Sequence, residues 1–207
     1  MYERDADALV ECQRHESLLN VAFADGPAFW LVCPYDTHAL DPGAIHGARC
    51  SHPVVANGGG RSASDAWDGL DAVAARFRQP LPDPPASAEK LRFEGLDAHA
   101  ALRRLVAERA AEAGIDPLRT NDLLVAVTEL TTNSVLHAGG GGLLRVWREP
   151  GALVCEVRDS GHIADPLVGR RRPPLSGPAG GWGVWLMNQL CDLVQVRSDP
   201  VEAGEDG

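Results

Sequence analysis

Glu129-Leu-Thr-Thr-Asn133 lies near the middle of residues 116–137, a stretch that the sequence predicts to be one long helix. Asp116 is a suitable N-cap, Pro117 suits the first turn, and Gly139 follows the expected end. A spacing of four residues places Glu129 and Asn133 on the same face, one turn apart. A carboxylate beside an amide can position a water and complete a Mg²⁺ shell, but the pair alone equally fits a solvated polar face.

The segments around this helix predict a sheet covered by helices. Residues 97–113 have the apolar spacing of an amphipathic helix that ends at Gly114. Two apolar runs, 143–148 and 153–158, are separated by a Pro-Gly turn signal and predict an antiparallel hairpin. A short helix over 182–190 and a strand over 193–196 follow. We therefore expect an α+β fold with helices on one face of a mostly antiparallel sheet.

Two further motifs follow the helix. Asp159-Ser160-Gly161 ends the second predicted strand, where a carboxylate can accept a hydrogen bond from an exocyclic amine such as that of adenine. Gly180-Gly181-Trp182-Gly183 precedes the predicted helix, whose free N–H groups can bind phosphate. Each motif alone also fits an ordinary turn. A Rossmann site is excluded, because the proline-rich residues 170–178 before the glycines cannot form a central strand.

The order and spacing of the three motifs together resemble the GHKL ATPases, over roughly residues 88–198. Glu129-Leu-Thr-Thr-Asn133-Ser-Val-Leu-His137-Ala138 is similar to the N-box of the anti-sigma-factor kinase branch of that family. Asp159-Ser-Gly161, followed by Asp165-Pro166, resembles its first glycine box and the start of its lid. Gly180-Gly-Trp-Gly183 resembles its second glycine box.

The resemblance implies a Bergerat-type ATP-binding α/β sandwich that uses ATP and Mg²⁺. Asn133 would help to bind Mg²⁺, and Asp159 would recognise the adenine amine. Gly161, Gly181 and Gly183 would shape the pocket and receive the phosphates. Glu129 matches the family position that acts as general base on the acceptor serine hydroxyl. Residues 162–180 would form the ATP lid, in which one of Arg170, Arg171 and Arg172 could neutralise phosphate charge.

The N-terminal residues resemble a second family. Glu11-Cys-Gln-Arg-His15-Glu16-Ser-Leu-Leu-Asn20, followed by Leu31-Val-Cys-Pro34-Tyr35-Asp36, is similar to the later half of the MEDS sensory domain. We thus predict a partial MEDS-like α/β region over 1–79, a proline-rich linker over 80–88, a GHKL-type ATPase domain over 89–198 and a polar tail over 199–207. One adjacent His15–Glu16 pair is too little for a metal site.

Local patterns predict the elements of this first region. Helices are expected over residues 5–24 and 65–77. Another helix is expected to start at Pro42, with Asp41 as its N-cap. Residues 29–33 form a short apolar run and predict a buried strand, and residues 57–62 predict a flexible loop.

Composition and charge narrow the function classes. The formal net charge is −10, which argues against non-specific binding to nucleic acid or anionic membrane, because both need a cationic face. The five widely spaced cysteines include no Cys-x-x-Cys pair, which indicates reduced thiols. No apolar run reaches the length of a membrane span, and the acidic start lacks a signal-peptide pattern. We expect a cytoplasmic protein.

The resemblance implies a serine/threonine protein kinase that phosphorylates a STAS-type anti-anti-sigma protein and sequesters a sigma factor. It is also compatible with a homodimer. A first alternative is a non-catalytic ATP-responsive binding protein. A second is a two-component histidine kinase, which needs a phosphoacceptor histidine before the ATP domain. His99 is the only histidine between the linker and the long helix, and it lies between Ala98 and Ala100 without an acidic neighbour.

Overall fold

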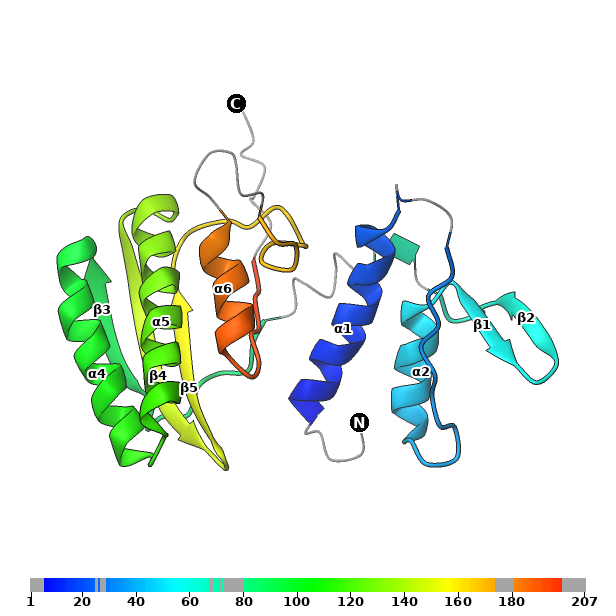
Figure 1. Ribbon diagram of the computed structural model, residues 1–207, viewed down its shortest axis with the longest axis horizontal. Helices are drawn as coiled ribbons and strands as arrows, with labels where there is room; N and C mark the ends of the chain where they lie inside the picture. Colours follow the sequence, from blue (N-terminus) through cyan, green and yellow to red (C-terminus); the bar gives the residue numbers. More distant parts are fainter. Residues whose placement is uncertain are drawn as a thin grey trace. The chain divides into compact units, whose positions relative to one another are not determined.

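The computed structural model of the 207-residue chain describes residues 6–24, 26, 29–67, 69, 70, 72, 80–173 and 181–198. The chain forms two compact units, residues 1–79 and 80–207 (Figure 1). The first unit contains α1 (Ala6–Ala22), α2 (Pro42–Ser51), β1 (Val54–Asn57) and β2 (Gly60–Ala63). The second contains β3 (Glu89–Glu94), a 3₁₀ turn (Leu96–Ala98), α4 (His99–Glu112), α5 (Pro117–His137), β4 (Gly141–Glu149), β5 (Ala152–Arg158) and α6 (Trp182–Leu190).

In the first unit, α1 packs against α2. Leu18 of α1 is buried, and the side-chain amide of Asn20 donates to the carbonyl of Ser51 at 2.8 Å. The start of α2 follows the prediction: Asp41 is the N-cap and accepts from the N–H of Gly43 at 2.7 Å, with a proline in the first turn. The two helices thus form the core of this unit.

Two predictions for the first unit are wrong. Residues 29–33 form no strand, and Trp30 and Val32 are 69% and 74% exposed. An apolar run forms a buried strand only where another strand pairs with it, and no strand of the described residues does. The expected flexible loop at 57–62 is a β-hairpin, in which Asn57 of β1 pairs with Gly60 of β2 around a glycine turn. Most of the helix expected over 65–77 lies outside the described residues.

The second unit is built on a three-stranded antiparallel sheet in the order β3-β4-β5. The register pairs Leu91 with Leu144 and Val146 with Cys155. Because side chains alternate across a sheet, these apolar residues share one face. Helices α4 and α5 lie over that face in Figure 1. The fold class is thus confirmed as α+β, with helices on one face of an antiparallel sheet.

The core between this sheet and its helices is aliphatic with one aromatic ring. Its buried members are Phe93, Leu102, Leu105, Val106, Leu124, Val127, Leu144 and Val146. Burying each such side chain contributes about 1.5–3 kcal/mol, so α4 and α5 are held on the sheet chiefly by apolar packing. The polar face of α5 is left to carry other groups.

Helix α5 begins where the sequence predicts. Asp116 is its N-cap and accepts from the N–H of Leu118 at 2.8 Å, with Pro117 in the first turn. It runs for 21 residues to His137, and Gly139 follows its C-cap. None of the helices that the structure describes is long and apolar enough to cross a membrane.

The edges of the sheet differ from the predictions. Strand β3 was not foreseen, because it directly follows the proline-rich segment and is only six residues long. The strand expected over 193–196 is not formed: these residues have no regular structure, and Leu193 is half exposed. In the parts of the chain that the structure describes, no strand pairs with the outer edge of β5. The polar tail 199–207 lies outside those parts.

Candidate functional site

Helix α6 contacts α5 where Glu129 and Asn133 lie. A Cβ atom added to Gly183 of α6 would lie 2.9 Å from Glu129 Oε2 and 3.2 Å from Asn133 Nδ2. Both are closer than ordinary Cβ contacts, so only glycine fits here without displacing the two polar side chains. The structure therefore brings together the Glu129–Asn133 pair and the second glycine motif, which are 50 residues apart in the chain.

Asp159 follows β5 and is held from two sides. The hydroxyl of Ser134 on α5 donates to Asp159 Oδ2 at 2.5 Å, and the N–H of Gly161 donates to Oδ1 at 2.9 Å. Ser134 is buried, whereas Asp159 is exposed. Two donors fix the direction of the carboxylate, while its exposure leaves it able to accept a hydrogen bond from a ligand.

Gly161 also lies against α5. A Cβ atom at Gly161 would be 2.7 Å from the Cβ of Ala138, the residue that caps α5. The loop can therefore pass close to the end of the helix only because this position is glycine. Ser160 strengthens the same contact, since its hydroxyl donates to the carbonyl of Ala138 at 3.1 Å.

The N-terminus of α6 begins at Gly181. Its φ of +85° is a left-handed conformation that side chains disfavour, and no side chain among the described residues caps the helix. The first N–H groups of a helix have no partner within the helix, and together with the helix dipole they favour anions. Gly180, the other glycine of this motif, lies outside the described residues.

The first part of the predicted lid packs against α6. Residues 165–170 form a turn in which Asp165 accepts from the N–H of Leu167 at 2.8 Å, and Leu167 is buried. Gly169 lies so close to α6 that a Cβ atom there would be 2.5 Å from Val184 Cγ1 and 2.8 Å from the Val184 carbonyl. Residues 174–180, the rest of the lid, lie outside the described part of the chain.

Helix α5 is thus the common support of all three motifs. Gly183 contacts it at Glu129 and Asn133, Asp159 contacts it at the next residue, Ser134, and Gly161 contacts it at Ala138. One helix therefore contacts all three motifs, with its carboxylate–amide pair against the glycine-rich start of α6 and its last turn against the loop that carries Asp159.

Comparison with known families agrees with this geometry. The model of the histidine kinase-like ATPase domain matches residues 94–204, more than half of the chain. The chain belongs to the histidine kinase-like ATPase family. The model of the methanogen/methylotroph, DcmR sensory domain (MEDS) matches residues 2–53. Searches of curated proteins and of solved structures found no match.

These matches confirm the two resemblances that the sequence motifs indicate. The histidine kinase-like ATPase family binds ATP, typically with Mg²⁺. The residues present fit this ligand: Gly183 leaves free the space that a Cβ would fill beside Glu129 and Asn133, and the set offers amide and carboxylate oxygens of the kind Mg²⁺ prefers. In the described residues, no group of three or more His, Cys, Asp or Glu side chains could hold a metal ion.

Two hollows are lined in part by Ser160, and one of them also by Asp159. The one that includes Asp159 and Ser160 has a volume of about 430 Å³ and is also lined by Arg92, Arg145 and Arg158. Neither hollow includes Glu129 or Asn133. Arg92 and Arg145 face away from α4 and α5, because they alternate with Phe93 and Leu144, so this hollow is not the place where the motifs meet.

Sequence reasoning missed several residues of this ATPase domain. Ser134 follows Asn133 directly, but nothing local shows that its hydroxyl reaches Asp159. No sequence pattern indicates a role for Asn188 either. Its side-chain amide donates to the carbonyls of Val184 at 3.0 Å and of Gly169 at 3.4 Å. Arg170 ends the turn that packs against α6, and Arg171 and Arg172 follow it. A phosphate-binding role for these arginines remains a prediction.

Proposed function

We propose that the ATPase domain binds Mg·ATP and transfers its γ-phosphoryl group to a serine or threonine of a protein substrate. One observation carries this proposal: Gly183 lies directly against Glu129 and Asn133, while Asp159 is oriented by Ser134 on the same helix. In this proposal Asn133 is the cation-binding amide, Glu129 is the carboxylate near the phosphates, and Asp159 is the acceptor for the adenine amine.

Each residue then has a distinct task. The Asp159 carboxylate accepts from the exocyclic amine of adenine. The amide oxygen of Asn133 helps to hold Mg²⁺, and the backbone at Gly181 and Gly183 binds phosphate oxygens at the start of α6. Gly161 lets the loop after Asp159 pass close to Ala138. Glu129 takes the proton from the acceptor hydroxyl as that oxygen attacks. Bound ATP supplies the phosphoryl group.

The protein substrate that we propose is a STAS-type anti-anti-sigma protein, and the second partner is a sigma factor that the domain sequesters. The resemblance of the N-box and the glycine boxes to the anti-sigma kinase branch supports both partners.

Two measurements test the proposal in order. Calorimetry with Mg·ATP should show binding by the unchanged chain and its loss in Asn133→Ala and Asp159→Asn. Incubation with labelled ATP and a STAS protein should then label one serine or threonine. Glu129→Gln should retain ATP binding and lose labelling, because it removes the base and keeps a side chain of similar size. No binding by the unchanged chain would refute the nucleotide site, and labelling by Glu129→Gln would refute the role of Glu129.

A non-catalytic ATP-responsive binding protein is the second candidate. It is favoured by the outer edge of β5, which no described strand pairs with, since an open edge suits binding to a partner. In this case the Glu129→Gln variant would bind the protein partner and respond to ATP as the unchanged chain does. Neither protein would label a substrate with phosphate from ATP.

A histidine kinase is disfavoured by the position of His99. Its Nε2 is buried and accepts or donates no hydrogen bond among the residues that the structure describes. A phosphoacceptor nitrogen must be reachable by the γ-phosphate of ATP. Acid-labile autophosphorylation lost in His99→Gln would contradict this conclusion.

A further inference from the structure

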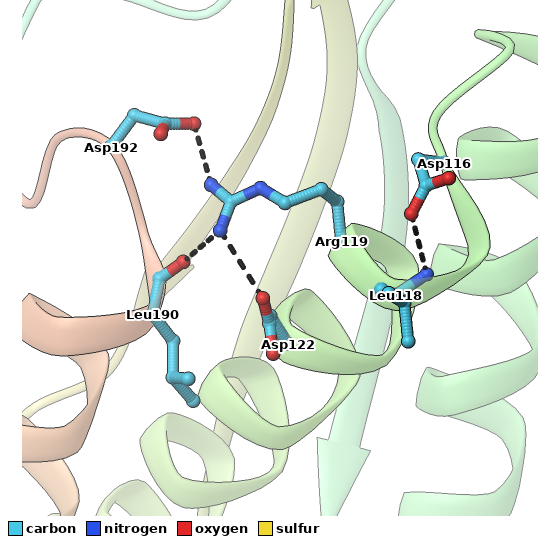
Figure 2. Close-up of polar contacts among 6 residues, drawn as sticks. All are labelled: Asp116, Leu118, Arg119, Asp122, Leu190 and Asp192. Carbon is cyan, nitrogen blue, oxygen red and sulfur yellow. Dashed lines mark hydrogen bonds and ion pairs between the residues drawn. The ribbon is translucent and has the colours of Figure 1, made fainter.

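Arg119 joins the first turn of α5 to the end of α6. Figure 2 shows its guanidinium between the two segments: Nη1 donates to the carbonyl of Leu190 at 2.9 Å and to Asp122 Oδ2 at 3.2 Å. Nη2 donates to Asp192 Oδ2 at 2.8 Å. One side chain of α5 therefore binds both the last carbonyl of α6 and the carboxylate just beyond it.

The chemistry of this contact suits the end of a helix. The last carbonyl groups of a helix lack partners within it and carry partial negative charge, which cations stabilise. Helix α6 has no basic residue in its own last turn, so Arg119 supplies that cation from α5. The hydrogen bond and charge of Asp192, with those of Asp122, raise the pKa of Arg119. A guanidinium can make these bonds at once because its donors are fixed in a planar fork.

Helix α6 is consequently held on α5 at both ends. At its start Gly183 lies against Glu129 and Asn133, and at its end Leu190 is bound by Arg119. The helix has nine residues, which corresponds to a length of about 13 Å. A helix this short moves as a rigid body, so release of its end would change the position of its start.

We propose that Arg119 is a positioning residue for the nucleotide site: by binding Leu190 and Asp192 it keeps Gly183 and the N-terminus of α6 against Glu129 and Asn133. The inference rests on the proposed function, because its consequence is a change in ATP affinity. Arg119 itself touches none of the residues assigned to ATP.

The contact is open to water, which gives it a second property. Arg119 is 44% exposed and Asp192 is 95% exposed. Salt screens charges this exposed: the Debye length is about 8 Å at physiological ionic strength and about 3 Å at 1 M. The contribution of Arg119 to ATP affinity should therefore shrink as salt increases, over and above the general effect of salt on ATP.

The test compares Arg119→Ala and Asp192→Asn with a matched control, Arg109→Ala. Arg109 is also a partly exposed arginine in a helix, and it binds Glu112 at 2.7 Å, but it contacts no part of α6 among the described residues. Two quantities are measured on the full chain: hydrogen exchange of the peptide spanning 182–192 without nucleotide, and the Kd for Mg·ATP at low and high salt. Far-UV circular dichroism verifies that each variant is folded.

Arg119→Ala should raise hydrogen exchange in α6 and raise the Kd for Mg·ATP by roughly five- to tenfold at low salt. At 1 M salt the Kd of the variant should differ less from that of the unchanged chain. Asp192→Asn should act in the same direction more weakly, because Leu190 and Asp122 still hold Arg119. Arg109→Ala should change neither quantity. Arg119→Lys should retain the affinity only in part, since an ammonium lacks the planar fork.

Three results would overturn the inference. Equal α6 exchange in Arg119→Ala and Arg109→Ala would show that Arg119 does not hold α6. Raised exchange with an unchanged Kd would show that α6 is held but that the site does not depend on it. Absence of ATP binding by the unchanged chain would refute the proposed function and the positioning role together, and the exchange data would then separately show whether the contact exists.

Discussion

Gly183 of α6 and Glu129 of α5 lie so close that a single added Cβ atom would be 2.9 Å from the carboxylate oxygen. Substitution of glycine by alanine in a helix normally stabilises it, by about 0.5–1 kcal/mol. At this position the methyl group would instead displace Glu129 or Asn133. Gly183→Ala should therefore stabilise helix α6 and at the same time disturb the nucleotide site.

We predict that Gly183→Ala abolishes or strongly weakens Mg·ATP binding while the melting temperature stays the same or rises. Calorimetry and thermal unfolding of the same samples measure the two effects. Gly58→Ala is the matched control, because a Cβ atom at Gly58 meets nothing within 4 Å. Full ATP affinity in Gly183→Ala would place the nucleotide elsewhere.

The hydroxyl of Ser134 is predicted to matter through Asp159. Ser134→Ala removes the donor at 2.5 Å and leaves Asp159 held only by the N–H of Gly161, so the carboxylate is less firmly oriented. We expect ATP affinity to fall about tenfold and the free energy of unfolding to fall by about 1–2 kcal/mol. Ser160→Ala, which removes a nearby hydroxyl bonded to Ala138 instead, should change affinity much less. Equal effects of the two substitutions would contradict the prediction.

Asp159 should make the site selective for adenine. Its carboxylate only accepts hydrogen bonds, and adenine presents an amine where guanine presents a carbonyl oxygen. A site built to accept a hydrogen bond from one ligand can bind an analogue without the donor about 10⁴-fold more weakly. We therefore predict that excess GTP fails to displace labelled ATP from the unchanged chain, whereas the same excess of unlabelled ATP displaces it. Equal competition by ATP and GTP would count against this role.

Cys155 should make the second unit sensitive to alkaline pH. Burial, together with the nearby Cys191, raises the pKa of the Cys155 thiol from 9.0 to about 12. The folded state therefore favours the protonated thiol, so its stabilising contribution is complete below pH 9 and is lost as pH rises toward 12. Measured by denaturant unfolding between pH 8 and 11, Cys155→Val should lose stability less steeply than the unchanged chain. Cys12→Val, in the first unit, is the cysteine control, and parallel curves for Cys155→Val and the unchanged chain would contradict the prediction.

The sequence predicts well those elements whose signals are local. The bounds of α5 follow from Asp116, Pro117 and Gly139, and the β4–β5 hairpin follows from a Pro-Gly turn between two apolar runs. Strands at an edge are different, because a strand exists only through its partner. Residues 29–33 and 193–196 have strand-like composition but no described partner, whereas the short β3, which was not foreseen, pairs with β4 along its whole length.

The same distinction applies to the candidate site. Glu129, Asn133, Asp159, Gly161, Gly181 and Gly183 were found because their types and spacing form a motif, and the structure places Gly183 beside the first two. Their roles remain predictions. Ser134 and Arg119 were not found, since their contacts join segments that are 25 and more than 70 residues apart. Such contacts leave no pattern in a single sequence.

The contacts that three separate motifs make with α5 between Glu129 and Ala138 also limit how the length of this helix can change. Each residue turns an α-helix by about 100°, so a deletion or insertion of one residue between Asn133 and Ala138 would rotate one contact away from the others. Ser134, Ala138 or both could then no longer face their partners, Asp159 and Gly161, while Glu129 and Asn133 face Gly183. Relatives that keep the site should therefore differ from this chain in the identity of residues along α5, and should keep the same number of residues from Glu129 to Ala138.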